Sequence, residues 1–185
     1  GGQSLDTIFQ LNAEEEVSEW TQVLTASSFT KEVTNSMHGD ASYRFTKGNT
    51  AISEAITTPV QLVPPRFRGN LATLCFPYNY DGANEKIRVE LIVSDGTTET
   101  IVMTSLLRGT NGKTEVFRGT AQVLPSSVSC KVKFTSFEDT AGKVFNFDDI
   151  QLTSDTTVYA DQPYITPWES FTPTGTWTTN TTYTG

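Results

Sequence analysis

Apolar and polar residues alternate along most of this chain. The clearest case is the range 86–94, where apolar side chains at every second position share one face and Arg88 and Glu90 lie on the other. A period of two is typical of a β-strand with one buried face. Similar patterns predict strands over these further ranges: 5–11, 17–25, 28–33, 42–46, 51–57, 71–78, 99–107, 115–124, 128–137 and 143–152.

Turn residues separate these segments. Asp95-Gly96 and Asn111-Gly112 each predict a tight turn, because both residue types in such a pair tolerate positive φ. No window carries an apolar stripe at helical spacing that is long enough for a major helix, and the acidic stretch 13–19 is the one helical alternative. Strands at intervals of roughly 8–12 residues predict an all-β protein, built as an antiparallel β-sandwich.

The end of the chain departs from this pattern. After Thr153 the sequence is rich in Thr, Pro, Tyr and Trp. We predict a sandwich over 1–155, a linker over 156–165, and a short extension over 166–185 that is the start of a second β-element or an inter-subunit arm. Such an extension cannot bury a core of its own, because domains below about 40 residues rarely do.

Charge and composition narrow the range of partners. The chain of 185 residues carries 13 basic and 21 acidic residues, for a net charge of −8. Nucleic acids and anionic membranes attract positive surfaces, so neither is the expected partner, and no apolar run reaches the roughly 18 residues of a membrane span. Neutral or cationic partners, Ca²⁺ among them, suit this charge. Cys75 and Cys130 lie in predicted strands, where two buried thiols or a disulfide would both fit.

One group of residues has the chemistry of a sugar-binding face. Aromatic rings stack on the apolar faces of pyranoses, while nearby amides and charged groups bond the hydroxyls. The alternative is aromatic packing at a sheet edge beside a surface ion pair. The candidate residues, from the end of one predicted strand and the polar face of another, are Tyr78, Asn79, Tyr80, Asp81, Arg88 and Glu90.

Catalytic chemistry finds little support. His38 is the one histidine, which removes most schemes based on a histidine nucleophile, base or metal triad. Two carboxylates about 5–9 Å apart could cleave a glycoside, but no pair of acids is singled out by the sequence. We therefore expect a protein that is not an enzyme.

Three motifs, in this order, carry a resemblance to a known fold. They are Asn12…Glu14…Trp20 near the start, Gly39-Asp40-Ala41-Ser42-Tyr43, and Phe147-Asp148-Asp149-Ile150-Gln151-Leu152 near the end of the sandwich. Together they make the range 5–152 resemble the jelly roll of carbohydrate-binding modules and galactose-binding-like domains.

The resemblance implies a metal site. In that fold the first and last strands lie side by side, and their acidic residues share a structural Ca²⁺. The matching positions here are Glu14 and Asp148 or Asp149. Ca²⁺ takes 6–8 oxygen ligands, and carboxylates supply several of them. The alternative is that these acids are simply solvated.

A second resemblance covers the range 166–185. The segments Pro167-Trp168-Glu169-Ser170-Phe171-Thr172-Pro173-Thr174-Gly175 and Trp177…Asn180-Thr181-Thr182-Tyr183-Thr184-Gly185 are similar to a segment of bacteriophage virion proteins, where it opens a small β-domain in head or tail fibres.

The two resemblances together imply a non-catalytic module on the virion surface that contacts a glycan. Its partners would be other virion proteins and a cell-surface glycan, and it would form homo-oligomers, with a trimer as the expected form in a fibre. Two alternatives remain at this point: a purely structural capsid decoration or tail component without sugar binding, and a fragment of a glycan depolymerase.

Overall fold

The computed structural model describes residues 6–13, 16–32, 41–48, 52–82 and 85–155. The chain divides into two units, Gly1–Ser154 and Asp155–Gly185. The predicted linker and extension, at 156–185, lie outside the described residues and stay predictions. So does Glu14, and so does the turn around His38.

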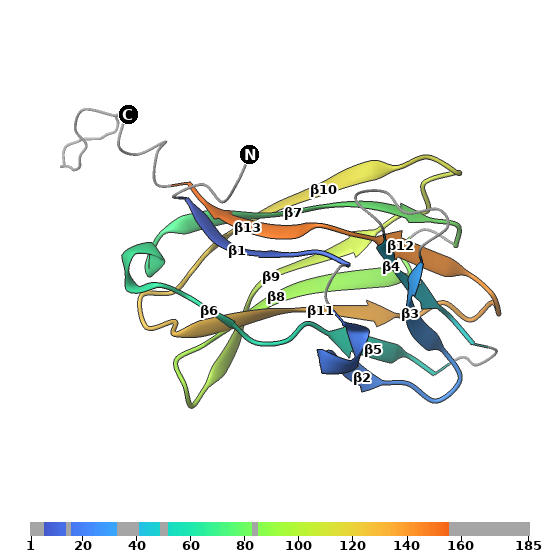
Figure 1. Cartoon of the computed structure of the whole chain (residues 1–185), viewed down its shortest axis with the longest axis horizontal. Coiled ribbons are helices and arrows are strands. Elements are labelled where there is room, and N and C mark those ends of the chain that lie inside the picture. The colour runs from blue at the N-terminus through green and yellow to red at the C-terminus, as the bar shows by residue number, and fades with distance from the viewer. Residues whose placement is uncertain (1–5, 14–15, 33–40, 49–51, 83–84, 156–185) are drawn as a thin grey trace. The chain divides into compact units, whose positions relative to one another are not determined.

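Two antiparallel sheets form the first unit, and Figure 1 shows them as two stacked layers. The seven-stranded sheet has the order β1 (Thr7–Leu11), β13 (Ile150–Ser154), β7 (Leu71–Tyr80), β12 (Val144–Phe147), β4 (Ser42–Thr46) and β3 (Ser28–Glu32), with β10 (Glu115–Gln122) paired to β7. The six-stranded sheet has the order β2 (Thr21–Val23), β5 (Glu54–Thr57), β11 (Ser129–Ser136), β8 (Ile87–Ser94) and β9 (Glu99–Leu107), with β6 (Gln61–Leu62) paired to β11. The described residues also form two short 3₁₀ helices, η1 (Val17–Glu19) and η2 (Pro65–Phe67). None of the described helices is long and apolar enough to span a membrane.

This arrangement confirms the predicted fold class, an all-β antiparallel sandwich. It also confirms that the first and last strands of the sandwich are neighbours, because β1 pairs with β13 along its length. The alternating pattern decides which side chains enter the core. In β8 the inward residues are almost fully buried and their polar neighbours face outward, as predicted.

Two predicted strands have different bounds. The range 143–152 is two strands, because the chain breaks at Asp148-Asp149, where Asp149 takes a φ of 47°. β12 then pairs with β4 and β7, while β13 pairs with β1 and β7. The range 17–25 begins with η1 before β2, so the short helical alternative at 13–19 is correct for its last three residues.

The turns follow the predicted chemistry. Asp95-Gly96 joins β8 to β9, with Gly96 at a φ of 100°. The Asp95 carboxylate accepts the backbone N–H groups of Thr98 at 2.7 Å and Thr97 at 2.8 Å. Asn111 and Gly112, with φ values of 55° and 80°, turn the chain between β9 and β10 and so lead from one sheet to the other.

Aromatic rings fill the space between the sheets. Phe134 of β11 lies 4.6 Å from Phe147 of β12 and 5.4 Å from Phe76 of β7, between ring centroids. Trp20, predicted as a core residue, is 4% exposed and packs 4.8 Å from Phe29. These contacts join the two layers and leave the outer face of each sheet to other roles.

Candidate functional site

The two outer faces differ in chemistry. The outer face of the seven-stranded sheet carries mostly threonines, amides and arginines. One row of it, set by the strand register, consists of Thr7, Thr153, Thr73 and Thr120. A second pair, Asn146 and Asn79, is joined by a side-chain hydrogen bond of 3.0 Å. This face resembles a regular polar surface.

The outer face of the six-stranded sheet mixes charged, hydroxyl and apolar groups. One cross-strand row consists of Thr21, Thr57, Lys133, Glu90 and Thr104. The adjacent row consists of Val23, Ala55, Thr135, Arg88 and Leu106. Residues in one row are about 5 Å apart, so neighbouring groups can contact the same small ligand.

Arg88 is the centre of this face. Its guanidinium carbon lies 4.9 Å from the centroid of the Phe137 ring, and its Nε lies 3.6 Å from an oxygen of Glu90. The Arg88 side chain is 37% exposed and that of Glu90 is 9% exposed. The Arg88 Nε and the Thr135 Oγ1 are buried without a hydrogen-bond partner. A polar cluster with unsatisfied groups beside open surface is suited to binding.

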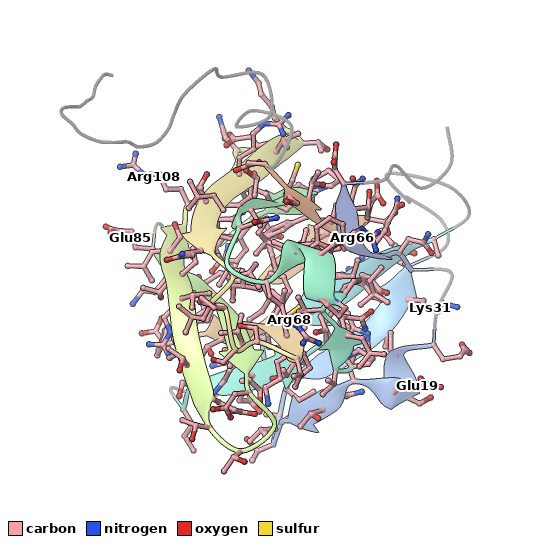
Figure 2. The ribbon with its side chains drawn as sticks, turned by 90° about the vertical axis from the view of Figure 1, so that its left-hand side faces the viewer. Glu19, Lys31, Arg66, Arg68, Glu85 and Arg108 are labelled. Carbon is pink, nitrogen blue, oxygen red and sulfur yellow. The ribbon has the colours of Figure 1, made fainter. Side chains whose placement is uncertain are left out.

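A groove adjoins this cluster where β8 begins and β9 ends. We call it the β8–β9 groove; it is an open depression of about 620 Å³. Figure 2 shows Glu85 and Arg108 pointing outward on the same side of the molecule. Leu106, which is 47% exposed, supplies apolar surface within it. The residues that line the groove are Glu85, Arg88, Thr104, Ser105, Leu106 and Arg108.

The six residues predicted to bind sugar do not form one site. Arg88 and Glu90 lie together on β8, whereas Tyr78, Asn79 and Tyr80 lie on β7 in the other sheet. The side chains of Tyr78 and Tyr80 are 6% and 2% exposed, so neither ring presents a face for stacking on a sugar.

The contacts of the β7 residues are internal. The Tyr80 hydroxyl donates to Glu138 at 2.7 Å, and burial together with the charge of Glu115 raises the pKa of Tyr78. Asp81, at the end of β7, accepts the backbone N–H of Val144 at 2.7 Å. These contacts lie within the sandwich. For Tyr78 and Tyr80 they agree with the packing half of the alternative, which was aromatic packing at a sheet edge beside a surface ion pair.

A second depression, of about 470 Å³, lies at the loop end of the sandwich. It is lined by Tyr80, Asp81, Gly82, Gly109, Asn111 and Gly112. A Cβ at Gly82 would clash with the Tyr80 hydroxyl, so the close packing of this loop requires glycine there. This loop-end depression has backbone groups and few charges, which makes it a weaker candidate than the β8–β9 groove.

Two of the three predicted calcium residues, Asp148 and Asp149, lie between β12 and β13. Asp148 is 1% exposed, and its carboxylate accepts the backbone N–H of Ala13 at 3.0 Å. The two carboxylate oxygens of Asp149 accept the amides of Gln10 at 2.7 Å and Gln151 at 3.0 Å. Within the described part of the chain, no three His, Cys, Asp or Glu side chains are grouped so as to hold a metal. Because Glu14 lies outside that part, the calcium site stays a prediction.

The two cysteines are unpaired. Cys130 is 2% exposed in the core, where burial raises its pKa to about 12, and Cys75 is half-buried on the outer face of the other sheet. The disulfide alternative is therefore wrong.

The sequence analysis missed residues of the groove and of the Arg88 cluster beside it. Phe137 follows Lys133 and Thr135 at every second position. The alternation of that segment could therefore have predicted that Phe137 lies on the outward face. Leu106 meets Arg88 through the pairing of β9 with β8, and Arg108, the residue after β9, lines the groove with them. That contact depends on the register between two strands, which the sequence did not reveal.

Comparison with known proteins agrees with the fold. No protein-family model matches the chain, and no curated protein matches it. Among solved structures, the CBM22-1 xylan-binding domain of Paenibacillus barcinonensis Xyn10C has a TM-score of 0.56 at 12% identity, covering 83% of this chain and 97% of that domain. TmCBM61, solved in complex with β-1,4-galactotriose, has a TM-score of 0.50 at 18% identity, covering 76% of this chain and 91% of that one.

A phage protein is also similar. The enzymatically active domain of tailspike protein 4 from bacteriophage CBA120 has a TM-score of 0.60 at 13% identity, and the match covers 77% of this chain but 20% of the tailspike chain. At these identities the likeness shows the fold: a jelly-roll sandwich of the type found in carbohydrate-binding modules.

Proposed function

We propose that this chain is a non-catalytic glycan-binding module and that the β8–β9 groove, with the Arg88 cluster beside it, is the contact surface. The observation that carries this proposal is Arg88. Its side chain is held over Phe137 and beside Glu90. Thr135 lies opposite Arg88 in the register of β11 and β8, and its buried hydroxyl has no hydrogen-bond partner. Sugars present both hydroxyls and apolar C–H faces, so they match a surface that combines polar groups with exposed Leu106.

The structural neighbours support this function. The solved domains named above include a xylan-binding domain and a module in complex with a galactotriose. Both are similar to this chain over three quarters of its length or more. Their sequence identities to this chain are low, so their ligands do not identify the sugar that this chain would bind.

The proposed setting is the surface of a phage virion. The resemblance of the segment 166–185 to phage virion proteins supports it, and so does the similarity to a phage tailspike domain. In that setting the chain acts as a homo-oligomer, such as a trimer, in contact with other virion proteins and with a cell-surface glycan. Several weak sites on one particle would then bind together with high avidity. The mass of the full chain in solution, by light scattering, tests the oligomer.

We also propose a structural Ca²⁺ at the junction of β1 and β13. The buried carboxylate of Asp148 supports this, because it lies against Ala13, the residue before Glu14. The ion would hold the first and last strands together. Thermal unfolding of the full chain with Ca²⁺ and with EDTA tests it, and Asp148→Asn should remove any stabilisation that Ca²⁺ gives.

The experiment for glycan binding uses the full chain on a glycan array, followed by titration of the best ligand. Leu106→Ala removes apolar surface from the groove, and we expect affinity to fall about fivefold, which corresponds to about 1 kcal/mol. Val116→Ala is the matched control, because Val116 is 52% exposed on the outer face of the other sheet. No binding to any glycan, or an equal effect of the two variants, would contradict the proposal.

A structural role without sugar binding is the second candidate function. The row of four threonines on the seven-stranded sheet favours it, because a regular polar face can pack against another subunit. Thr120→Lys would then reduce the oligomeric mass, whereas a glycan-binding module would keep its affinity. Release of reducing ends from a bound glycan would instead favour a depolymerase.

A further inference from the structure

The outer face that contains the groove has a charge balance that differs from that of the whole chain. The chain has a net charge of −8, yet the outward positions of β8, β9 and β11, with the residue that follows β9, include four basic residues. Lys131 is already paired with Glu99 at 2.6 Å, and Glu90 is shielded, at 9% side-chain exposure, beside Arg88. The outward basic residues are Arg88, Arg108, Lys131 and Lys133.

Arg88 is positioned to bind an anion. The Phe137 ring and the Glu90 carboxylate fix the guanidinium, and its Nε is buried. Since the side chain is still 37% exposed and lines the groove, its Nη groups are the part that reaches a ligand. A guanidinium presents parallel N–H donors that match the two oxygens of a carboxylate, which a single sugar hydroxyl does not.

The rest of the groove fits a sugar ring that carries such a group. Arg108, which is exposed, lines it together with Arg88, and Leu106 lies directly opposite Arg88 in the strand register. A ring whose C–H face contacts Leu106 can direct a carboxylate substituent toward the two arginines. Glu85 is the exposed acid among the lining residues, so it disfavours a ligand that would place a second negative charge near it.

We propose that the β8–β9 groove selects sugars that carry a carboxylate, such as uronic or sialic acids, and that Arg88 and Arg108 bind this carboxylate. This proposal rests on the proposed glycan-binding function. It adds the chemical class of the ligand, which neither the sequence motifs nor the structural neighbours assign.

The test compares matched sugars on the full chain. Each of three acidic ligands, an oligogalacturonide, an oligoglucuronide and sialyllactose, is titrated beside its carboxyl-reduced counterpart. At low salt we expect at least one acidic sugar to bind about tenfold more tightly than its reduced form, as a charge-assisted hydrogen bond allows. The preference should shrink as salt is added.

Variants locate the effect. Arg88→Gln and, separately, Arg108→Gln should bring the acidic and reduced sugars to within about twofold of each other. Arg118→Gln, an exposed residue on the outer face of the other sheet, should leave the preference unchanged. Thermal unfolding shows whether each variant is folded. If Arg88→Gln is unstable, Arg108→Gln still tests the proposal, because Arg108 is exposed.

Three outcomes would overturn the inference. Equal binding of acidic and reduced sugars would contradict it while leaving glycan binding in place. Equally tight binding of a sulfated counterpart would point to general attraction of anions in place of carboxylate recognition. No binding of any sugar would contradict both this inference and the proposed function.

Discussion

Glu54 gives the strongest test of how the six-stranded sheet is held. This β5 residue is 2% exposed, and its carboxylate accepts hydrogen bonds from the turn between β2 and β3. The donors are the backbone N–H and hydroxyl of Thr25, the backbone N–H of Ala26 at 3.0 Å, and the backbone N–H and hydroxyl of Ser27. Burial alone raises the pKa of Glu54, but the hydrogen bonds from Ser27, Thr25 and Ala26 outweigh it and lower the pKa from 4.5 to about 2.

The pKa difference sets the magnitude. At about 1.4 kcal/mol for each tenfold change in proton affinity, it corresponds to about 3 kcal/mol of stability. Because the folded-state pKa of Glu54 is the lower one, this stability is complete above pH 4.5 and is lost as the pH falls toward 2. Glu54→Gln puts an amide N–H₂ group among N–H and O–H donors, so we expect its free energy of unfolding at neutral pH to fall by about 3 kcal/mol.

Urea unfolding of both proteins over this pH range is the assay. The stability of the wild type should fall more steeply with pH than that of Glu54→Gln between pH 4.5 and 2. Glu99→Gln is the control, because Glu99 is 55% exposed and pairs with Lys131 at the surface, where the loss should stay below about 1 kcal/mol. A loss for Glu54→Gln no larger than that of the control, or parallel pH profiles, would refute the reasoning.

Three further outcomes are expected. In the native protein the thiol of Cys130 is buried in the core and has a pKa of about 12, so it should resist a thiol reagent at mildly alkaline pH, whereas Cys75 should react. Rapid modification of both thiols would contradict this. Phe134→Ala should lower the free energy of unfolding in urea by about 3–5 kcal/mol, since it removes a ring that joins both sheets, and a loss below about 1 kcal/mol would show that the layers do not pack through it. Gly82→Ala should cost about 1–3 kcal/mol by calorimetry, because its Cβ meets the Tyr80 hydroxyl, and an unchanged melting temperature would disprove that close contact.

Alternation and turn chemistry were enough to predict the architecture. The parity of β8 and β11 placed their buried faces correctly, and Asp95-Gly96 and Asn111-Gly112 marked real turns. These features are local, so they can be recognised within a few residues of sequence. The adjacency of β1 and β13, which came from resemblance to a known fold, was also confirmed.

The features that the sequence did not reveal depend on tertiary contacts. The break at Asp149 divides an apparently continuous strand: both halves pair with β7, but on the other side one half pairs with β4 and the other with β1. The same holds for the site: Tyr78 and Tyr80 resembled a stacking surface, yet they share the inward parity of Phe76. Arg88 meets Leu106 because β8 pairs with β9 in one particular register, and it meets Phe137 where the chain leaves β11. Composition determines neither of these arrangements.

The most direct test of the central proposal is to map, residue by residue, where a glycan touches the protein. Backbone amide chemical shifts of the full chain can be followed by NMR as the best array ligand is added. We predict that the largest changes fall on outward positions of β8 and β9 and on Phe137, with little change along the threonine row of the other sheet. Changes centred on that threonine row or on the loop-end depression, or no change with any glycan, would contradict the account.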